Sequence, residues 1–200
     1  MAWPSGTAEM VDERFYSPQP TDFTVTKSNT WRGTNIAVRN SAGESVMKVE
    51  RAHTGYSNLR SKCILDAASR RPLITLVRTR SLQPRWEAFR GQSTSRTERL
   101  FVAMDRSRFI QRGVTFHVFL DGNSSSDGAP DFFAHCSYLG PMNVSRGGDN
   151  YVALIERETT SLPEEEGREH TYTVRINAGV DQLLVLALTV VHDSLTTEVS

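Results

Sequence analysis

The feature that most constrains the fold of this chain is an apolar segment near its C-terminus. Residues 183–191 read LLVLALTVV, and the surrounding segment from Val180 to Asp193 is the strongest helix candidate in a sequence otherwise patterned as strands. A helix that is apolar on every side is either buried in the protein or inserted in a membrane. The choice between these two places decides the fold.

The length and the flanks of this segment favour burial in the protein. A helix over residues 180–193, at about 1.5 Å per residue, extends about 21 Å, whereas the hydrocarbon core of a bilayer is about 30 Å thick. Asp181 lies near the start of the segment and Asp193 at its end. We therefore predict a buried helix at about 180–193 and no transmembrane segment, with Asn177 as its cap and Asp181 complementing the helix dipole.

The rest of the chain is patterned as short strands separated by turns. Val114, Phe116, Val118 and Leu120 are apolar at the two-residue period that gives a strand one apolar face. We predict strands over residues 22–28, 36–39, 45–50, 63–66, 73–80, 85–90, 100–104, 114–120, 131–139, 150–157 and 171–176, while the pattern leaves the strand boundaries around residues 140–148 open. So many short strands with regular turns indicate an antiparallel sandwich or barrel.

A helix without a polar face must be covered on all sides, and this requirement favours a barrel over an open sheet. A single sheet covers one side of a helix, whereas a closed barrel surrounds it and also removes the sheet edges. The predicted fold class is mainly β, an antiparallel closed barrel around a central hydrophobic C-terminal helix. Residues 1–21, rich in Pro, Ser, Gly and Thr, are assigned to a flexible tail and residues 22–198 to a single domain.

The charges are distributed unevenly, although the net charge is zero. Residues 60–112 carry thirteen Lys/Arg and four Asp/Glu, and residues 113–200 carry four Lys/Arg and thirteen Asp/Glu. Either these basic and acidic segments pair with each other, or the basic segment offers a face to an anionic partner. The candidate residues for such a face are Arg70, Arg71, Arg78, Arg80 and Arg85.

An anionic phospholipid headgroup is the candidate ligand for these arginines. Guanidinium groups suit bidentate phosphate recognition, and each basic group near an anionic leaflet contributes roughly 1 kcal/mol. Nucleic acid would use the same charges, but a neutral chain without an aromatic-rich sheet face argues against it. A protein partner remains the other possibility.

No constellation typical of catalysis or of metal binding stands out in the sequence. The five histidines are scattered, and His135 and Cys136 are neighbours in a predicted strand, so their side chains point to opposite faces. The other candidates are interpreted as buried thiols (Cys63 and Cys136), a residue of the barrel wall (Trp86) and solvated loops (Asp121–Gly128 and Glu164–Glu166). We therefore predict no enzymatic activity, no cofactor and no metal. An enzyme with a site inside the barrel or at its mouth is the alternative class.

Five segments, in this order, carry a family resemblance: Phe23–Val25, Trp31–Gly33, Arg71–Thr75, Arg85–Gly91 and Gly179–Asp193. Their most specific patterns are Arg-Trp-Glu-x-x-Arg-Gly and Gly-Val-Asp-Gln-x-x-x-x-x-Leu. The set resembles the plant LURP-one-related family over about residues 22–195. The resemblance implies a roughly twelve-stranded antiparallel barrel around a hydrophobic helix, the fold shared with tubby C-terminal domains and phospholipid scramblases. It also implies a link to plant defence, which holds for some members.

The function expected from these observations is that of a non-enzymatic barrel domain, a binding or adaptor module in defence or stress. The alternative is a peripheral membrane protein that binds phosphoinositide or another anionic lipid through the arginine-rich surface. Residues 1–15 contain no apolar core of a secretory signal. We expect an intracellular monomer, in the cytoplasm, in the nucleus or at the inner face of the plasma membrane.

Overall fold

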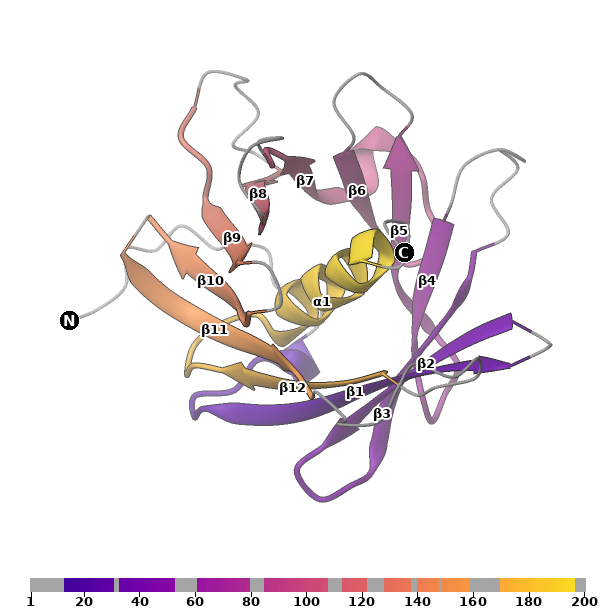
Figure 1. The fold of residues 1–200 in the computed structure, drawn as a ribbon. Coiled ribbons are helices and arrows are strands. Elements are labelled where there is room, and N and C mark those ends of the chain that lie inside the picture. Colours follow the sequence, from indigo (N-terminus) through magenta and orange to yellow (C-terminus); the bar gives the residue numbers. More distant parts are fainter. Residues whose placement is uncertain are drawn as a thin grey trace.

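A closed antiparallel barrel surrounds one helix in the computed structural model of the chain (Figure 1). The structure describes residues 13–30, 33–52, 61–79, 85–107, 113–121, 128–137, 140–147, 149–158 and 170–196. The strands within these residues are β1 (Thr21–Thr30), β2 (Gly33–Asn40), β3 (Ser45–Arg51), β4 (Ser61–Asp66), β5 (Pro72–Thr79), β6 (Arg85–Arg90), β7 (Arg99–Asp105), β8 (Gly113–Leu120), β9 (Phe132–Ser137), β10 (Met142–Arg146), β11 (Asn150–Arg157) and β12 (His170–Ile176). The helix α1 spans Gln182–Thr196, and two short 3-10 helices span Glu13–Phe15 (η1) and Arg96–Glu98 (η2).

Each strand pairs with the next one along the chain, and β1 pairs with β12 to close the barrel. At this closure Phe23 lies opposite Val174 and Val25 lies opposite Tyr172. Every described strand therefore has a neighbour on both sides, which leaves none of them as an edge strand. The predicted closed barrel is confirmed.

The strand β10 lies within residues 140–148, where the sequence pattern left the strand boundaries open. Met142 and Val144 are buried and belong to the core, and between them Asn143 faces outward. The strand is only five residues long, and a register shift after Val144 interrupts its pairing with β11. A short strand with one bulge offers too few alternating positions for the pattern to show in the sequence.

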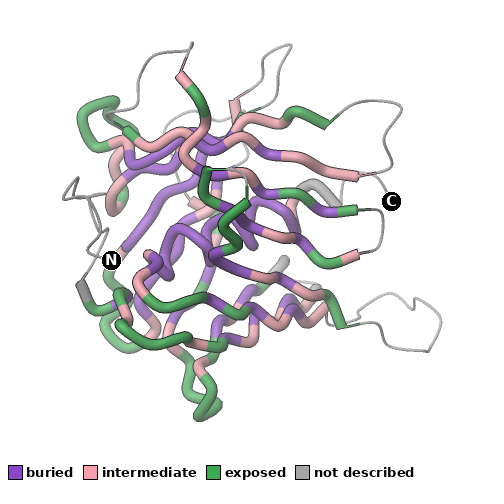
Figure 2. The backbone as a smooth tube through the Cα atoms, turned by 90° about the vertical axis from the view of Figure 1, so that its left-hand side faces the viewer, coloured by how far each residue is buried: buried purple, intermediate pink, exposed green. Residues whose placement is uncertain are grey.

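The helix α1 lies inside the barrel, and every residue from Leu183 to Asp193 is buried (Figures 1 and 2). Its walls include the inward alanines Ala88, Ala103 and Ala134, which are fully buried. Burying one large apolar side chain contributes about 1.5–3 kcal/mol, so the helix and the inner face of the barrel stabilise each other. No helix among the described residues combines the length and the apolarity needed to cross a bilayer.

The start of α1 differs from the prediction in its capping residue. The Asp181 Oδ1 atom accepts hydrogen bonds from the backbone N–H groups of Leu183 (2.8 Å) and Leu184 (3.2 Å). Asn177 instead donates its side-chain amide to the carbonyl of Tyr151 at 2.7 Å. The prediction of Asn177 as the cap was wrong, because the helix begins later, at Gln182, and Asp181 stands directly before it.

The two ends of the barrel are named here after the helix residues that lie at them, the Asp181 end and the Asp193 end. At the Asp181 end, the described part of the predicted tail contacts the barrel. Phe15 is buried in the core, Arg14 pairs with Asp66 at 3.1 Å, and Ser17 accepts a hydrogen bond from the backbone of Gly179. Contacts with the domain thus begin before residue 22, the predicted boundary, and residues 1–12 lie outside the described part of the chain.

Candidate functional site

The arginines predicted to form one anionic-ligand face lie at two ends of the barrel. Arg70 and Arg71 lie in the turn between β4 and β5, at the Asp181 end, whereas Arg78 and Arg85 lie at the Asp193 end. Seven residues of extended strand from Arg71 to Arg78 span about 23 Å. Arg80 lies outside the described residues. The structure therefore does not bring these four described arginines together on one surface.

The arginines at the Asp193 end also differ in the face they occupy. Arg78 lies opposite Trp86 in the register of β5 and β6, and Trp86 is buried in the core, as expected of a wall residue. Cross-strand partners share a face, so Arg78 lies on the inner side of the barrel wall. Arg85 lies on the outer side, where its guanidinium pairs with Glu87 at 2.9 Å.

Ion pairs within the molecule neutralise part of the positive charge of the basic segment. Arg99 pairs with Asp121 at 3.0 Å and Lys62 with Asp193 at 3.8 Å, and both pairs join the basic segment to the acidic one. Arg70 pairs with Glu50 of β3 at 2.7 Å. Internal pairing therefore accounts for some of the uneven charge. This agrees with the first interpretation of the sequence, in which the basic and acidic segments pair with each other.

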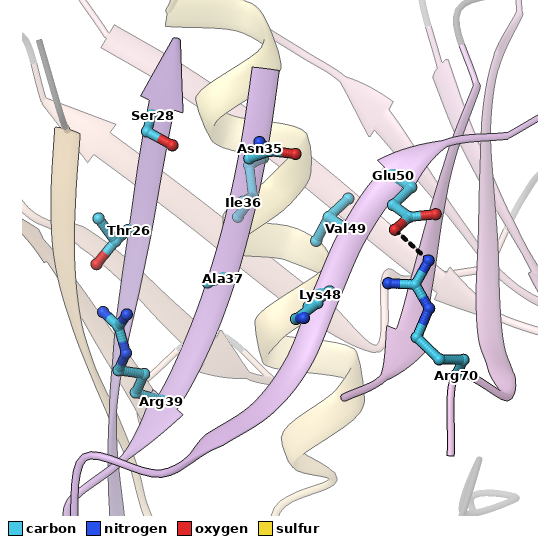
Figure 3. A pocket seen from close by; sticks show the side chains of 10 residues that line it. All are labelled: Thr26, Ser28, Asn35, Ile36, Ala37, Arg39, Lys48, Val49, Glu50 and Arg70. Atoms are coloured by element: carbon cyan, nitrogen blue, oxygen red, sulfur yellow. Dashed lines mark ion pairs between the residues drawn. The ribbon is translucent and has the colours of Figure 1, made fainter. Parts of the chain in front are cut away.

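A hollow of about 360 Å³ on the outer wall, lined by described residues, is a candidate binding site (Figure 3). We call it the outer groove. It runs over β1, β2 and β3 and reaches the turn between β4 and β5. Its lining consists of Thr26, Ser28, Asn35, Ile36, Ala37, Arg39, Lys48, Val49, Glu50 and Arg70.

Strand register explains why the outer wall is hollowed here. Thr26, Ala37 and Lys48 lie side by side across β1, β2 and β3. The small side chains of Thr26 and Ala37 form the floor of the groove, and Arg39 lies further along β2 on the same outward face. A register shift between Val38 and Arg39 breaks the pairing with β3 at this point. The sequence therefore places long cationic side chains around short ones.

The groove carries an excess of positive charge. Its one acid, Glu50, is paired with Arg70, while neither Arg39 nor Lys48 makes an ion pair with any described residue.

Arg70 has a φ of 60°, which is uncommon outside glycine, and a hydrogen-bonded turn holds it there. In that turn Asp66 accepts hydrogen bonds from Ser69 at 2.7 Å, and these bonds lower the pKa of the Asp66 carboxyl.

Sequence reasoning included Arg70 but missed Arg39 and Lys48, because both precede the basic segment. The hairpin predicted around residues 40–43 could have revealed them. It joins two neighbouring strands, so their outward residues must lie on one surface. No pattern in the sequence points to the hydroxyl and amide groups of Thr26, Ser28 and Asn35 as part of a site, since the hollow they line depends on the shape of the wall.

A second polar cluster lies inside the barrel at its Asp193 end. The Asp193 Oδ1 atom accepts hydrogen bonds from Lys27 Nζ at 3.1 Å and from the Tyr172 hydroxyl at 3.2 Å. Lys62 Nζ lies 3.8 Å from Asp193 Oδ2. Burial lowers the pKa of Lys62 and also the pKa of the neighbouring His192, and in both cases Asp193 acts in the opposite direction.

The remaining sequence candidates have ordinary surroundings where the structure describes them. Cys63 and Cys136 are free and buried, and burial raises the pKa of both thiols. His135 is exposed on the opposite face of β9 from Cys136, as predicted. The described residues contain no group of His, Cys, Asp or Glu suited to holding a metal ion. Residues 122–127 and 161–169, which carry most of the two predicted acidic loops, lie outside the described part.

Comparison with known proteins places the chain in a family. The model of the LURP-one-related family matches residues 21–193. The chain belongs to the LURP-one-related family. Similar Arabidopsis thaliana proteins include LURP-one-related 15, which is 27% identical over 98% of this chain and 89% of its own length. Another is LURP1, 24% identical over 91% of this chain and 87% of its own length.

A solved structure of this fold is also similar to the chain. The X-ray structure of an Arabidopsis thaliana protein superposes with a TM-score of 0.67. It covers 94% of this chain and 99% of the other, at 24% sequence identity. This likeness shows the fold, and the predicted LURP-one-related barrel around a central helix is confirmed.

Proposed function

We propose that this LURP-one-related barrel is a non-enzymatic binding module whose ligand site is the outer groove. The favoured ligand is the phosphorylated headgroup of an anionic lipid such as a phosphoinositide, bound from the membrane surface. A role in plant defence or stress is part of the proposal and rests on the family resemblance alone. The observation that carries the proposal is the pair Arg39 and Lys48, which have no ion-pair partner among the described residues and flank a polar hollow.

The interior of the barrel supports a binding role rather than a catalytic one. The buried stretch of α1, from Leu183 to Asp193, occupies the space that a substrate would need inside the wall. Small-ligand sites are commonly concave, with a few well-placed polar groups. In this molecule the outer groove has that form, and its base is a strand surface that the packed core holds rigid.

The chemistry of the groove matches a phosphorylated polyol. Arg39 and Lys48 provide two positive charges for phosphate oxygens, and arginine can do so through two parallel hydrogen bonds. Thr26, Ser28 and Asn35 provide hydroxyl and amide groups for ring hydroxyls. Because Arg70 and Glu50 are both substantially exposed, their ion pair can open to a phosphate at small cost.

Vesicle co-sedimentation tests the proposal. Wild-type protein is mixed with vesicles of phosphatidylcholine alone, or with phosphatidylserine or phosphatidylinositol 4,5-bisphosphate added. We expect binding only to the anionic vesicles, and most to the phosphoinositide. The double variant Arg39→Ala/Lys48→Ala is expected to lose about 2 kcal/mol, or roughly 30-fold in partition, at about 1 kcal/mol per basic group.

A charge-matched control separates a site from a general positive field. The variant Arg85→Ala/Arg96→Ala also removes two arginines that the structure places on β6 and η2, away from the groove. This control is expected to bind as the wild type does. Equal binding to neutral and anionic vesicles would refute the lipid ligand. A loss of vesicle binding only in Arg85→Ala/Arg96→Ala, or only in Arg78→Ala/Arg80→Ala, would place the site at the arginines first identified in the sequence.

A further inference from the structure

The cations of the outer groove come from neighbouring parts of the wall. Arg39 lies on β2, Lys48 lies on β3, and Arg70 follows β4 in the turn to β5. Figure 3 shows Lys48 between the two arginines. The guanidinium of Arg70 is paired with Glu50, whereas Arg39 and Lys48 make no ion pair with any described residue. The groove therefore offers two unpaired cations and a third that an internal carboxylate occupies.

The backbone of Arg70 directs attention to its side chain. Its φ of 60° lies in the left-handed region, which glycine adopts at the lowest cost. The turn holds this conformation, because the Arg70 N–H donates to the carbonyl of Asp66 at 3.0 Å and the Asp66 carboxylate pairs with Arg14 at 3.1 Å. From this turn the guanidinium reaches Glu50 of β3 at 2.7 Å. Backbone strain of this kind is a reason to look for a function of the side chain.

The ion pair between Arg70 and Glu50 is one that an anionic ligand can open. The two side chains are 55% and 43% exposed, so water screens their attraction. A phosphate group carries more negative charge than a carboxylate and has three acceptor oxygens. A guanidinium binds it through two parallel hydrogen bonds. A phosphate that enters the groove can therefore replace the Glu50 carboxylate on Arg70.

Ligands with one phosphate and with several phosphates experience Glu50 differently. A single phosphate bound by Arg39 and Lys48 leaves Glu50 in its ion pair, and the carboxylate then repels the negative charge of the ligand. A ligand with a second phosphate can bind Arg70 as well and gains a third cation. An internal anion that weaker competitors cannot displace acts against those competitors, which is a common source of specificity.

We propose that Glu50 makes the outer groove selective for headgroups with two or more phosphate groups, because the second phosphate must replace Glu50 on Arg70. This inference rests on the proposed function, since it concerns the ligand of the same groove. Arg39 and Lys48 bind the first phosphate, and Arg70 binds the second. The class of ligand is thereby narrowed to a phosphoinositide with a phosphorylated inositol ring, whose headgroup carries more than the single phosphate of phosphatidylinositol.

A variant with the wild type's net charge provides the main test. Glu50→Gln/Arg70→Gly removes both members of the ion pair and keeps Arg39 and Lys48. Glycine suits the φ of 60° at this position, so the turn is expected to keep its fold, and a thermal melt checks it. Calorimetric titration measures the affinities for inositol 1,4,5-trisphosphate and for inositol 1-phosphate. We expect the ratio of these affinities to fall several-fold in the double variant, since it lacks the third cation.

The single variant Glu50→Gln tests the opposite change. It leaves Arg70 without its carboxylate partner, so the trisphosphate is expected to bind several-fold more tightly than to the wild type. Glu156→Gln is the matched control, because Glu156 pairs with Arg175 at 3.3 Å at similar exposures of 43% and 58%, outside the lining of the groove. This control is expected to bind the trisphosphate as the wild type does.

The outcomes separate this inference from the proposed function. An unchanged affinity ratio in Glu50→Gln/Arg70→Gly, or equal tightening in Glu50→Gln and Glu156→Gln, would overturn the role of Glu50. If trisphosphate binding is nevertheless lost in Arg39→Ala/Lys48→Ala, the outer groove remains supported as the site. Absence of trisphosphate binding to the wild type would overturn both the selectivity and the groove.

Discussion

Asp193 in the helix α1 accepts a hydrogen bond from Lys27 in the strand β1 at 3.1 Å, although 166 residues separate them in the chain. The same carboxylate accepts the hydroxyl of Tyr172 in β12. Since β1 and β12 are the strands whose pairing closes the barrel, one buried side chain ties the end of the helix to that closure. Buried ionic groups can fix register in this way, even where they add little net stability.

Removing this carboxylate should destabilise the fold strongly. In Asp193→Ala, Lys27 stays buried without the carboxylate, and an uncompensated buried charge costs about 3–5 kcal/mol. The free energy of unfolding in urea measures this loss. Ser194→Ala, which removes only a hydroxyl bonded to the carbonyl of Val190 in the same helix, is the control and should cost less than about 1 kcal/mol. Equal losses in the two variants would show that the ion pair does not anchor the helix.

Placing a charge in the middle of α1 should prevent folding. Leu186 is buried within the barrel, and an unpaired carboxylate there is among the costliest changes a core can receive. We expect Leu186→Asp to show no cooperative thermal transition by circular dichroism. The volume-conserving Leu186→Met should cost less than about 1.5 kcal/mol and melt cooperatively. A normal melting transition in the aspartate variant is incompatible with central burial of the helix.

The cap of α1 can be tested by comparing two neighbouring polar residues. Asp181 accepts two hydrogen bonds from the first turn of the helix, so Asp181→Ala should lower the free energy of unfolding by about 1 kcal/mol, within a range of about 0.5–2. Asn177→Ala removes a bond to the backbone of Tyr151 and leaves the helix end intact. Chemical denaturation of both variants decides the matter, and a larger loss for Asn177→Ala would reassign the cap.

Stability should fall in mild acid because of His192. Burial lowers its pKa in the folded state, and the charge of Arg157 acts in the same direction. The unfolded chain therefore takes up the proton first, near pH 6.5, and folding stability declines as the pH falls below that value. His192→Gln should reduce the decline in unfolding free energy between about pH 7.5 and pH 5.5. His135→Gln, at an exposed position on β9, is the control, and an identical decline in both variants would contradict this origin.

The architecture could be predicted because it depends on patterns local in the sequence. The apolar run from Leu183 to Val191, interrupted only by Thr189, requires cover on all sides, and alternation such as Phe116 and Val118 marks the inward faces of the wall. Physical requirements of this kind do not depend on which strands meet. The boundaries of the strand β10 stayed open in the sequence, since five residues with a register shift give almost no periodic signal.

The candidate site could be predicted only in part, because it depends on register. The arginines 71 and 78 are close in sequence, yet an extended strand separates them. Lys48 and Arg39 come near each other through a hairpin and a register shift after Val38. Likewise, only the closed barrel brings Lys27 and Lys62 to Asp193. Charge counts along the chain identify basic segments and leave out such long-range arrangements.

The most direct test of the proposed binding site is an NMR titration with the headgroup itself. Backbone amide shifts of the 15N-labelled protein are followed while inositol 1,4,5-trisphosphate is added, with inositol as the uncharged reference. We predict saturable shifts that concentrate on the outer faces of β1, β2 and β3 around Arg39 and Lys48, and that disappear in Arg39→Ala/Lys48→Ala. Shifts centred elsewhere on the barrel, or equal responses to both compounds, would contradict the outer groove as the site.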